Sequence, residues 1–174
     1  MTTLKMDFKI NEALVNNLKG LKGGTVDVGW FEGQNYDDGT PIALVASVQE
    51  YGATINVTDK MRGWFLANGY PLRKETTQIH IPARSFMRST ADNKGNEWQK
   101  QIEKDLSKVI EGNLSLEEAL NRLGLKIKGD IQETISQITT PPNSAMTEQR
   151  KGFNKPLIDS GIMLDSVSIR TEVK

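Results

Sequence analysis

The sequence predicts an α+β fold in which a small antiparallel sheet packs against two long amphipathic helices. Segments 93–111 and 115–138 each repeat apolar residues at steps of three and four, the spacing of an amphipathic helix. Shorter segments before and after them alternate apolar and polar residues, as half-buried strands do. No internal repeat or shift in composition divides the 174 residues, so we expect a single domain over 1–174.

The N-terminal region 1–24 is predicted to contain a helix, and a strand is predicted to follow it. Apolar residues on one face predict a helix over 11–21, and the glycines that follow it are typical of a helix end. Segment 25–31 then alternates valines and a tryptophan with polar residues, which predicts the first strand.

A polar loop, 32–40, leads into the next predicted helix. Asp37 and Asp38 lack the regular ligand spacing of a calcium site, so we interpret them as turn residues. Pro41 suits the first turn of a helix, because its missing N–H has no partner to lose there. The apolar stripe expected for this helix comprises Leu44, Val45 and Val48.

The middle of the chain reads as two strands that flank an elaboration of the sheet. Strands are expected over 54–57 and 77–81, and the segment between them, 58–76, is long enough to form a protruding lobe. Thr58 or Asp59 can cap a short helix within that lobe.

The same lobe interleaves aromatic and basic residues: Lys60, Arg62, Trp64, Phe65, Tyr70, Arg73 and Lys74. Such residues can stack bases and neutralise phosphates, and they are also enriched at protein–protein interfaces. A local core under a long loop is the third interpretation. Asp59 and Glu75 dilute the positive charge, which favours an assembly interface over a nucleic-acid site. The contact residues of this interface would be Arg62, Trp64, Phe65, Tyr70 and Arg73, with Arg62 and Trp64 as its anchors.

Local signals define the two long helices. Ser115 and Glu118 have the spacing of a capping box, in which each side chain accepts from the other residue's backbone amide. Gly124 and Gly129 interrupt the apolar stripe of the second helix and indicate either close packing or a bend. The polar segment 143–154 has no periodicity, which predicts a loop.

The C-terminal segment 155–173 is predicted to deliver a closing strand to the sheet. Asp159 or Ser160 can cap a short helix there. The strand that follows alternates apolar and polar residues, so its apolar residues should face the core. These residues are Val167, Ile169 and Val173.

Composition excludes several kinds of chemistry. The 22 basic and 22 acidic residues balance, which argues against an obligate nucleic-acid binder. The chain has no cysteine, which excludes disulfides and thiolate metal sites. His80, the only histidine, lies on a predicted strand without a nucleophile pattern nearby. We therefore expect no enzymatic activity, no catalytic residue, no metal and no cofactor. With no membrane span and no secretory signal, the protein should be soluble and made in the cytosol.

Several short motifs occur in an order found in one protein family. They are Val28-Gly29-Trp30-Phe31-Glu32-Gly33, Gly39-Thr40-Pro41-Ile42-Ala43, Gln49-Glu50-Tyr51-Gly52, Ile81-Pro82-Ala83-Arg84-Ser85-Phe86-Met87-Arg88, Thr139-Thr140-Pro141-Pro142-Asn143-Ser144, Arg150-Lys151-Gly152 and the 155–167 segment. Over about residues 25–173 the chain resembles the tailed-phage neck proteins, which include head–tail connector, tail-completion and virion morphogenesis proteins.

The resemblance implies a structural role in a bacteriophage or prophage particle. Proteins of this family form homo-oligomeric rings at the head–tail junction of the virion, after assembly in the host cytoplasm. Their partners are the adjacent head-closure and tail proteins, and DNA only passes through the channel. Both a neck role and a tail-terminator role fit this expectation. The alternative is a small nucleic-acid-binding protein that uses the basic and aromatic residues of 58–76.

Overall fold

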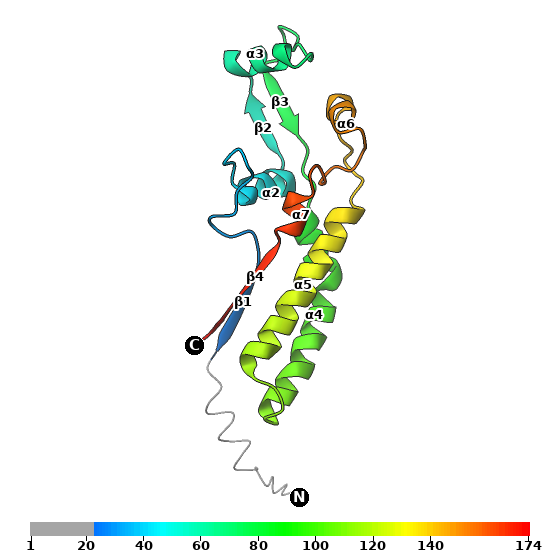
Figure 1. The fold of residues 1–174 in the computed structure, drawn as a ribbon. Helices are drawn as coiled ribbons and strands as arrows, with labels where there is room; N and C mark the ends of the chain where they lie inside the picture. The colour runs from blue at the N-terminus through cyan, green and yellow to red at the C-terminus, as the bar shows by residue number, and fades with distance from the viewer. Residues whose placement is uncertain (1–22) are drawn as a thin grey trace, which may run out of the picture. The chain divides into compact units, whose positions relative to one another are not determined.

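The computed structural model describes residues 23–174, so the helix expected over 11–21 lies outside the described residues. Within them the fold is α+β, as predicted, with six helices and two small antiparallel sheets (Figure 1). In chain order the elements are β1 Gly24–Gly29, α2 Ile42–Tyr51, β2 Ala53–Asn56, α3 Asp59–Ala67, β3 Gln78–Ile81, α4 Phe86–Ile110, α5 Leu116–Gln137, α6 Ala145–Lys151, α7 Ile162–Asp165 and β4 Ser168–Val173. The single small sheet expected from the sequence is thus two separate pairs, β1–β4 and β2–β3.

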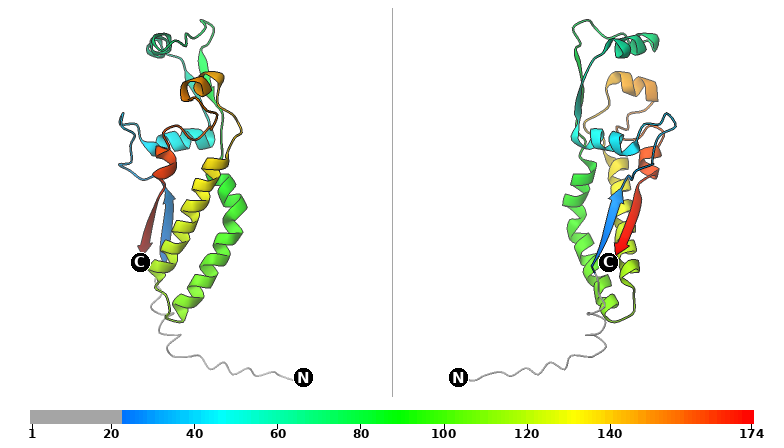
Figure 2. Two further views of the ribbon diagram at one scale, coloured as in Figure 1. Left: turned by 45° about the vertical axis from the view of Figure 1, so that its right-hand side comes forward. Right: turned by 90° about the vertical axis from the view of Figure 1, so that its left-hand side faces the viewer.

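Internal contacts group the chain into two compact units, a subdivision that no shift in composition marks. The described part of the first unit comprises 23–28, Gly95–Ile127 and Ile169–Lys174. The second comprises Gly29–Lys94 and Lys128–Ser168. Helices α4 and α5 are antiparallel neighbours, and each contributes residues to both units (Figure 2).

In the first unit, Gly124 of α5 brings the helix close to the β1–β4 sheet. A Cβ at this position would lie 2.8 Å from Cγ2 of Val26 and 3.3 Å from Cγ2 of Ile169. The hydroxyl of Thr171 in β4 also donates to Oδ1 of Asn121 in α5 at 2.8 Å. For Gly124 and Gly129 the sequence indicated either close packing or a bend, and close packing is what the structure has at Gly124. A Cβ at Gly129 would meet nothing within 4 Å.

The first unit also buries a carboxylate that the sequence did not reveal. Asp105 of α4 is only 1% exposed, and its side chain accepts from Nε2 of Gln101 at 2.7 Å. Lys108 and Arg122 place cationic nitrogens 3.5 and 3.7 Å from its Oδ1. Burial alone would raise the pKa of Asp105, but the hydrogen bonds from Gln101 and Lys108 and both positive charges outweigh it. The pKa is consequently lowered.

The core of the second unit forms around Phe86, the first residue of α4, which is fully buried. The Trp30 ring meets it edge-on, with centroids 5.7 Å apart, and Trp30 Nε1 donates to the carbonyl of Met163 at 2.9 Å. Thr90 Oγ1 donates to the Phe86 carbonyl at 2.6 Å and also bonds Thr134 Oγ1 at 2.7 Å. These contacts bring α4, α5 and the C-terminal segment to one core. Its other buried apolar residues are Ile42, Ala46, Ile131, Ile135, Leu157 and Val167.

Helix α2 turns a different face inward from the one expected. Its buried residues are Ile42, Ala46 and Glu50, spaced four apart. Leu44, expected in the apolar stripe, is 56% exposed. This helix is apolar on most sides, so the sequence did not define which face is buried, and the polar contacts of Glu50 decide it.

The segment 143–154, expected to be a loop, contains helix α6. The side chain of Ser144 accepts from the Thr147 amide at 3.2 Å, which caps the first turn. Gly152 ends the helix in the left-handed conformation, with φ of 77°. The prediction was wrong because this short helix has caps but no apolar periodicity.

The C-terminal segment forms a short helix and a strand, as predicted, but with a different cap. Gly161 is the N-cap of α7, and no side chain caps it. Asp159 instead pairs with Arg150 at 2.9 Å, and Ser160 Oγ lies 3.5 Å from the Ile162 amide, the limit for a hydrogen bond.

The closing strand is only partly buried. Val167, just before β4, is fully buried, and Ile169 is half-buried. Val173 is 48% exposed, so the expectation that it faces the core was wrong. It lies at the last position of β4, where the sheet has only two strands to cover it.

Candidate assembly interface

The segment 58–76 lies at the end of a two-stranded ribbon, as the sequence suggested. Strands β2 and β3 pair antiparallel with Thr54 opposite His80 and Ile55 opposite Ile79. Helix α3 sits at the far end of this ribbon from α2 (Figures 1 and 2). His80 is exposed on the strand, and its Nδ1 lies 3.2 Å from the Thr54 hydroxyl.

Local hydrogen bonds explain why α3 forms there. Thr58 is the N-cap, and its hydroxyl oxygen accepts from the Met61 amide at 3.2 Å. Asp59 lies in the first turn, where a negative charge interacts favourably with the helix dipole. At the other end, the Asn68 side chain donates to the Trp64 carbonyl at 2.7 Å. Of the two predicted caps, Thr58 is the one that acts.

The guanidinium of Arg62 forms hydrogen bonds within the lobe. It donates to the carbonyls of Arg73, Lys74 and Thr76, at 3.0, 3.3 and 2.6 Å. Three backbone acceptors thus tie the returning loop to α3. The anchor role expected of Arg62 stays a prediction, and the side chains of Lys60, Arg73 and Lys74 are exposed.

The aromatic residues divide between the inside and the outside of the lobe. Phe65 and Tyr70 are half-buried, and the Tyr70 amide donates to the Phe65 carbonyl at 2.8 Å. Trp64 meets Phe65 edge-on at 5.2 Å but remains 54% exposed. No residue of helix α3 is fully buried, so the lobe covers its apolar side chains only in part.

The structure adds Leu66 to the candidate contact residues. It is 66% exposed, more than Trp64 two positions earlier. Leu66 is neither aromatic nor basic, so the pattern of aromatic and basic residues in this segment does not include it.

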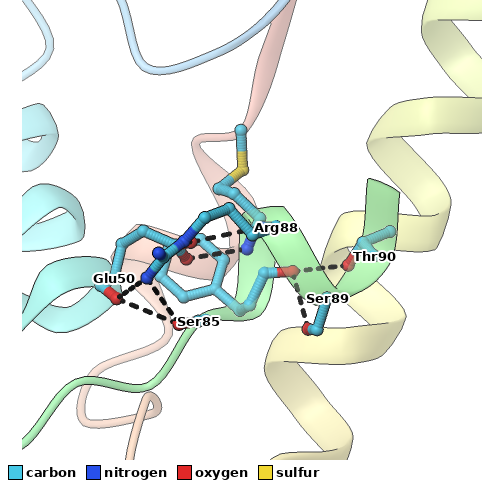
Figure 3. Close-up of polar contacts among 7 residues, drawn as sticks. Glu50, Ser85, Arg88, Ser89 and Thr90 are labelled. Atoms are coloured by element: carbon cyan, nitrogen blue, oxygen red, sulfur yellow. Dashed lines mark hydrogen bonds and ion pairs between the residues drawn. The ribbon is translucent and has the colours of Figure 1, made fainter. Parts of the chain in front are cut away.

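The buried carboxylate of Glu50, the last buried residue of α2, stabilises the base of the β2–β3 ribbon. It accepts from the backbone amides of Met87 at 2.8 Å and Arg88 at 3.2 Å, in the first turn of α4 (Figure 3). Nε of Arg88 donates to the same carboxylate at 2.9 Å, and its Nη2 donates to the Ser85 hydroxyl at 2.7 Å. A carboxylate at a helix N-terminus satisfies free amides and the helix dipole together.

Close backbone packing holds the same junction. Gly52 follows α2 with φ of 74°, a left-handed value that favours glycine. A Cβ there would lie 2.8 Å from the carbonyl oxygen of Ile81 and 2.9 Å from the Ala83 amide nitrogen. The end of β3 can therefore pass directly against the end of α2.

Arg84 connects this junction to the segment after α5. It is 5% exposed, and its guanidinium donates to the carbonyls of Pro141 at 2.7 Å and Pro142 at 2.8 Å. It also donates to Oε1 of Gln49 at 2.7 Å. Burial lowers the pKa of Arg84 from its usual value, and three acceptors compensate its desolvation.

The motifs that carry the family resemblance thus meet in one place within the second unit. Trp30 contacts Phe86, Glu50 binds the start of α4, and Arg84 binds the proline pair after α5. These contacts join segments that are distant in sequence.

Among residues 23–174, no group of three histidine or acidic side chains is placed to hold a metal ion. None of the helices described there is long and apolar enough to cross a membrane.

Ser115 and Glu118 form the predicted capping box at the start of α5. The Glu118 amide donates to Ser115 Oγ at 3.1 Å, and the Ser115 amide donates to Glu118 Oε2 at 3.0 Å.

Comparisons with protein-family models, with curated proteins and with solved structures found no match to this chain.

Proposed function

We propose that this protein is a structural component of a tailed-phage particle that forms a homo-oligomeric ring at the head–tail junction. The ring joins the head-closure and tail proteins and lets DNA pass. The order of the motifs over about residues 25–173 supports the family assignment, and the contacts among those motifs support a structural role.

The exposed apolar tip of the β2–α3–β3 lobe carries this proposal. Trp64 and Leu66 are more than half exposed on a helix that buries none of its residues. Arg62 fixes the loop beneath them through three backbone carbonyls. Exposed apolar side chains on a preorganised support are typical of a surface that another protein covers, since little ordering entropy is lost on binding.

The structure gives less support to the nucleic-acid alternative. Its most central cation, Arg62, already binds carbonyl oxygens, and Asp59 and Glu75 remain beside the exposed lysines. The lobe therefore offers few unpaired cations for a phosphate backbone, which dominates nucleic-acid affinity.

The test is assembly of the purified full chain without DNA. We expect native mass spectrometry to show a concentration-dependent shift from monomer to one closed oligomer, and electron microscopy to show rings. In a virion that contains the protein, a reconstruction should locate it between head and tail. A chain that stays monomeric at high concentration, yet shifts DNA in a salt-dependent manner, would contradict the proposal and support the alternative.

A further inference from the structure

The second unit contains a cavity of about 500 Å³ that the assembly interface does not use. Its walls come from α2, the end of β3, helix α6 and the segment 156–163. The volume lies within the range of pockets that bind small ligands or peptide side chains, roughly 300–1,000 Å³.

Apolar side chains make up most of the walls: Val45, Ile79, Ile81, Pro82, Met146 and Leu157. A ligand that fills the cavity must therefore present apolar groups to them. Inorganic phosphate or a nucleic-acid backbone would leave these walls uncovered, because both interact mainly through charge.

The lining has more positive than negative side chains. Arg84, Arg150 and Lys151 line the cavity together with a single carboxylate, that of Asp159. Nδ2 of Asn143 is buried, and in the described part of the chain it has no hydrogen-bond partner. A buried amide N–H without an acceptor destabilises the protein, so a ligand that supplies an acceptor gains affinity.

Two of the cations, Arg150 and Lys151, can still bind an anion. Arg150 pairs with Asp159, but both side chains are more than half exposed, and such pairs contribute little and exchange readily. The ammonium of Lys151 donates to the Lys155 carbonyl at 2.6 Å and lies over the Phe153 ring, which leaves further N–H groups. Burial lowers the pKa of Lys151, and the charges of Arg150 and Arg84 lower it further, against the opposing effect of Asp159. An added carboxylate would relieve this excess of positive charge.

We propose that this cavity binds a short segment of a partner protein, by a side-chain carboxylate next to an apolar side chain. The carboxylate accepts from Asn143 and Lys151, and the apolar side chain packs against Ile81 and Met146. The inference is independent of ring formation, because it concerns a different surface from the tip of the lobe.

Selection from a library of random short peptides, displayed on filamentous phage and panned on the immobilised full chain, tests this proposal. We expect the enriched sequences to share Asp or Glu beside Leu, Ile or Phe. The enriched peptide, made with a fluorescent label, should bind by anisotropy. Lys151→Gln and Asn143→Asp should each weaken binding about tenfold or more, since each removes a donor to a charged acceptor.

The controls separate the cavity from charge in general. Lys151→Arg keeps the positive charge and should retain binding, and Lys60→Gln combined with Lys74→Gln removes cations outside the cavity and should change nothing. Melting temperatures verify that each variant folds. Enrichment without this motif, or binding that ignores Lys151→Gln and Asn143→Asp, overturns the proposal. Octanoate or inorganic phosphate that displaces the peptide, when added at the concentration at which the peptide itself binds, also overturns the proposal. The ligand would then be a small amphiphile or a simple anion.

Discussion

The buried carboxylate of Glu50 receives two hydrogen bonds from Arg88, one from its backbone amide at 3.2 Å and one from its guanidinium Nε at 2.9 Å. The same carboxylate accepts the Met87 amide, so it caps α4 in the way that an N-cap residue would, although it comes from a different helix. Glu50 is 3% exposed and Arg88 is largely exposed, so the two partners do not contribute equally.

Replacement of Glu50 by Ala should destabilise the protein by about 2–3 kcal/mol, because it leaves helix amides without an acceptor in a buried place. Arg88→Ala should cost less, about 1 kcal/mol, because the Glu50 carboxylate keeps its hydrogen bonds from the backbone amides of residues 87 and 88 and the lost guanidinium is more than half exposed. Urea unfolding of both variants measures the difference. Equal losses for the two would show that the ion pair, and not the cap, stabilises this junction.

Interactions between near neighbours in sequence could be predicted, and the observed caps illustrate this. Ser115 with Glu118, and Thr58 at α3, each act within three residues, so spacing alone identifies them. Helix α6 also has local caps, although a loop was predicted there. Ser144 and Gly152 have the identities of an N-cap and a helix stop, but this short helix lacks the apolar periodicity from which a helix would be predicted.

Contacts between distant residues could not be predicted. Glu50 lies 37 positions from Met87, and Arg84 lies 57 from Pro141, so no local pattern links them. Within the candidate interface, the exposure of Trp64 followed from composition. The commitment of Arg62 to backbone carbonyls did not, because it depends on how the loop at 73–76 returns to α3.

Two glycines of α5 provide a matched test of helix–sheet packing. Gly124→Ala should destabilise the protein by about 1–3 kcal/mol, because the new methyl group overpacks against Val26 and Ile169. Gly129→Ala meets nothing within 4 Å, so it should stabilise by up to about 1 kcal/mol through helix propensity. Thermal unfolding of both variants measures the contrast. If Gly124→Ala also stabilises, the β1–β4 sheet does not pack closely on α5.

Asp105 should make stability depend on pH in the acid range. Its pKa in the folded protein is lowered below the usual value of an aspartate, so folding favours the ionised form. The resulting stabilisation is complete above the unfolded pKa and is lost as the pH falls through the folded pKa. Asp105→Asn should therefore melt below the wild type at neutral pH, and the gap should close below about pH 4.

Melting curves over this pH range measure the gap, with Asp92→Asn as the control. Asp92 is an exposed aspartate of the same helix and should show no comparable difference. A gap for Asp105→Asn that stays constant down to acid pH would mean that shape, and not charge, accounts for its effect.

The exposed tip of α3 makes the most direct prediction about assembly. Trp64→Ala combined with Leu66→Ala should leave the melting temperature nearly unchanged, because neither side chain is buried. The same double variant should lose the oligomer, since desolvated Trp side chains dominate interface energies, at about 2 kcal/mol or more each. Native mass spectrometry and melting curves of the same sample measure both effects. Leu44→Ala combined with Leu125→Ala removes equally exposed apolar side chains elsewhere and should retain the oligomer.

Arg62→Ala separates the support of the tip from its contact surface. Because its guanidinium binds three backbone carbonyls, this variant should loosen the loop at 73–76 and raise amide hydrogen exchange there. Assembly should weaken as well, because the exposed side chains of the tip must then be ordered when they bind.

Two outcomes would contradict the prediction for Trp64 and Leu66. If Trp64→Ala with Leu66→Ala unfolds the isolated chain, these residues belong to a core. If it folds and still forms the oligomer, the subunit interface lies on another surface.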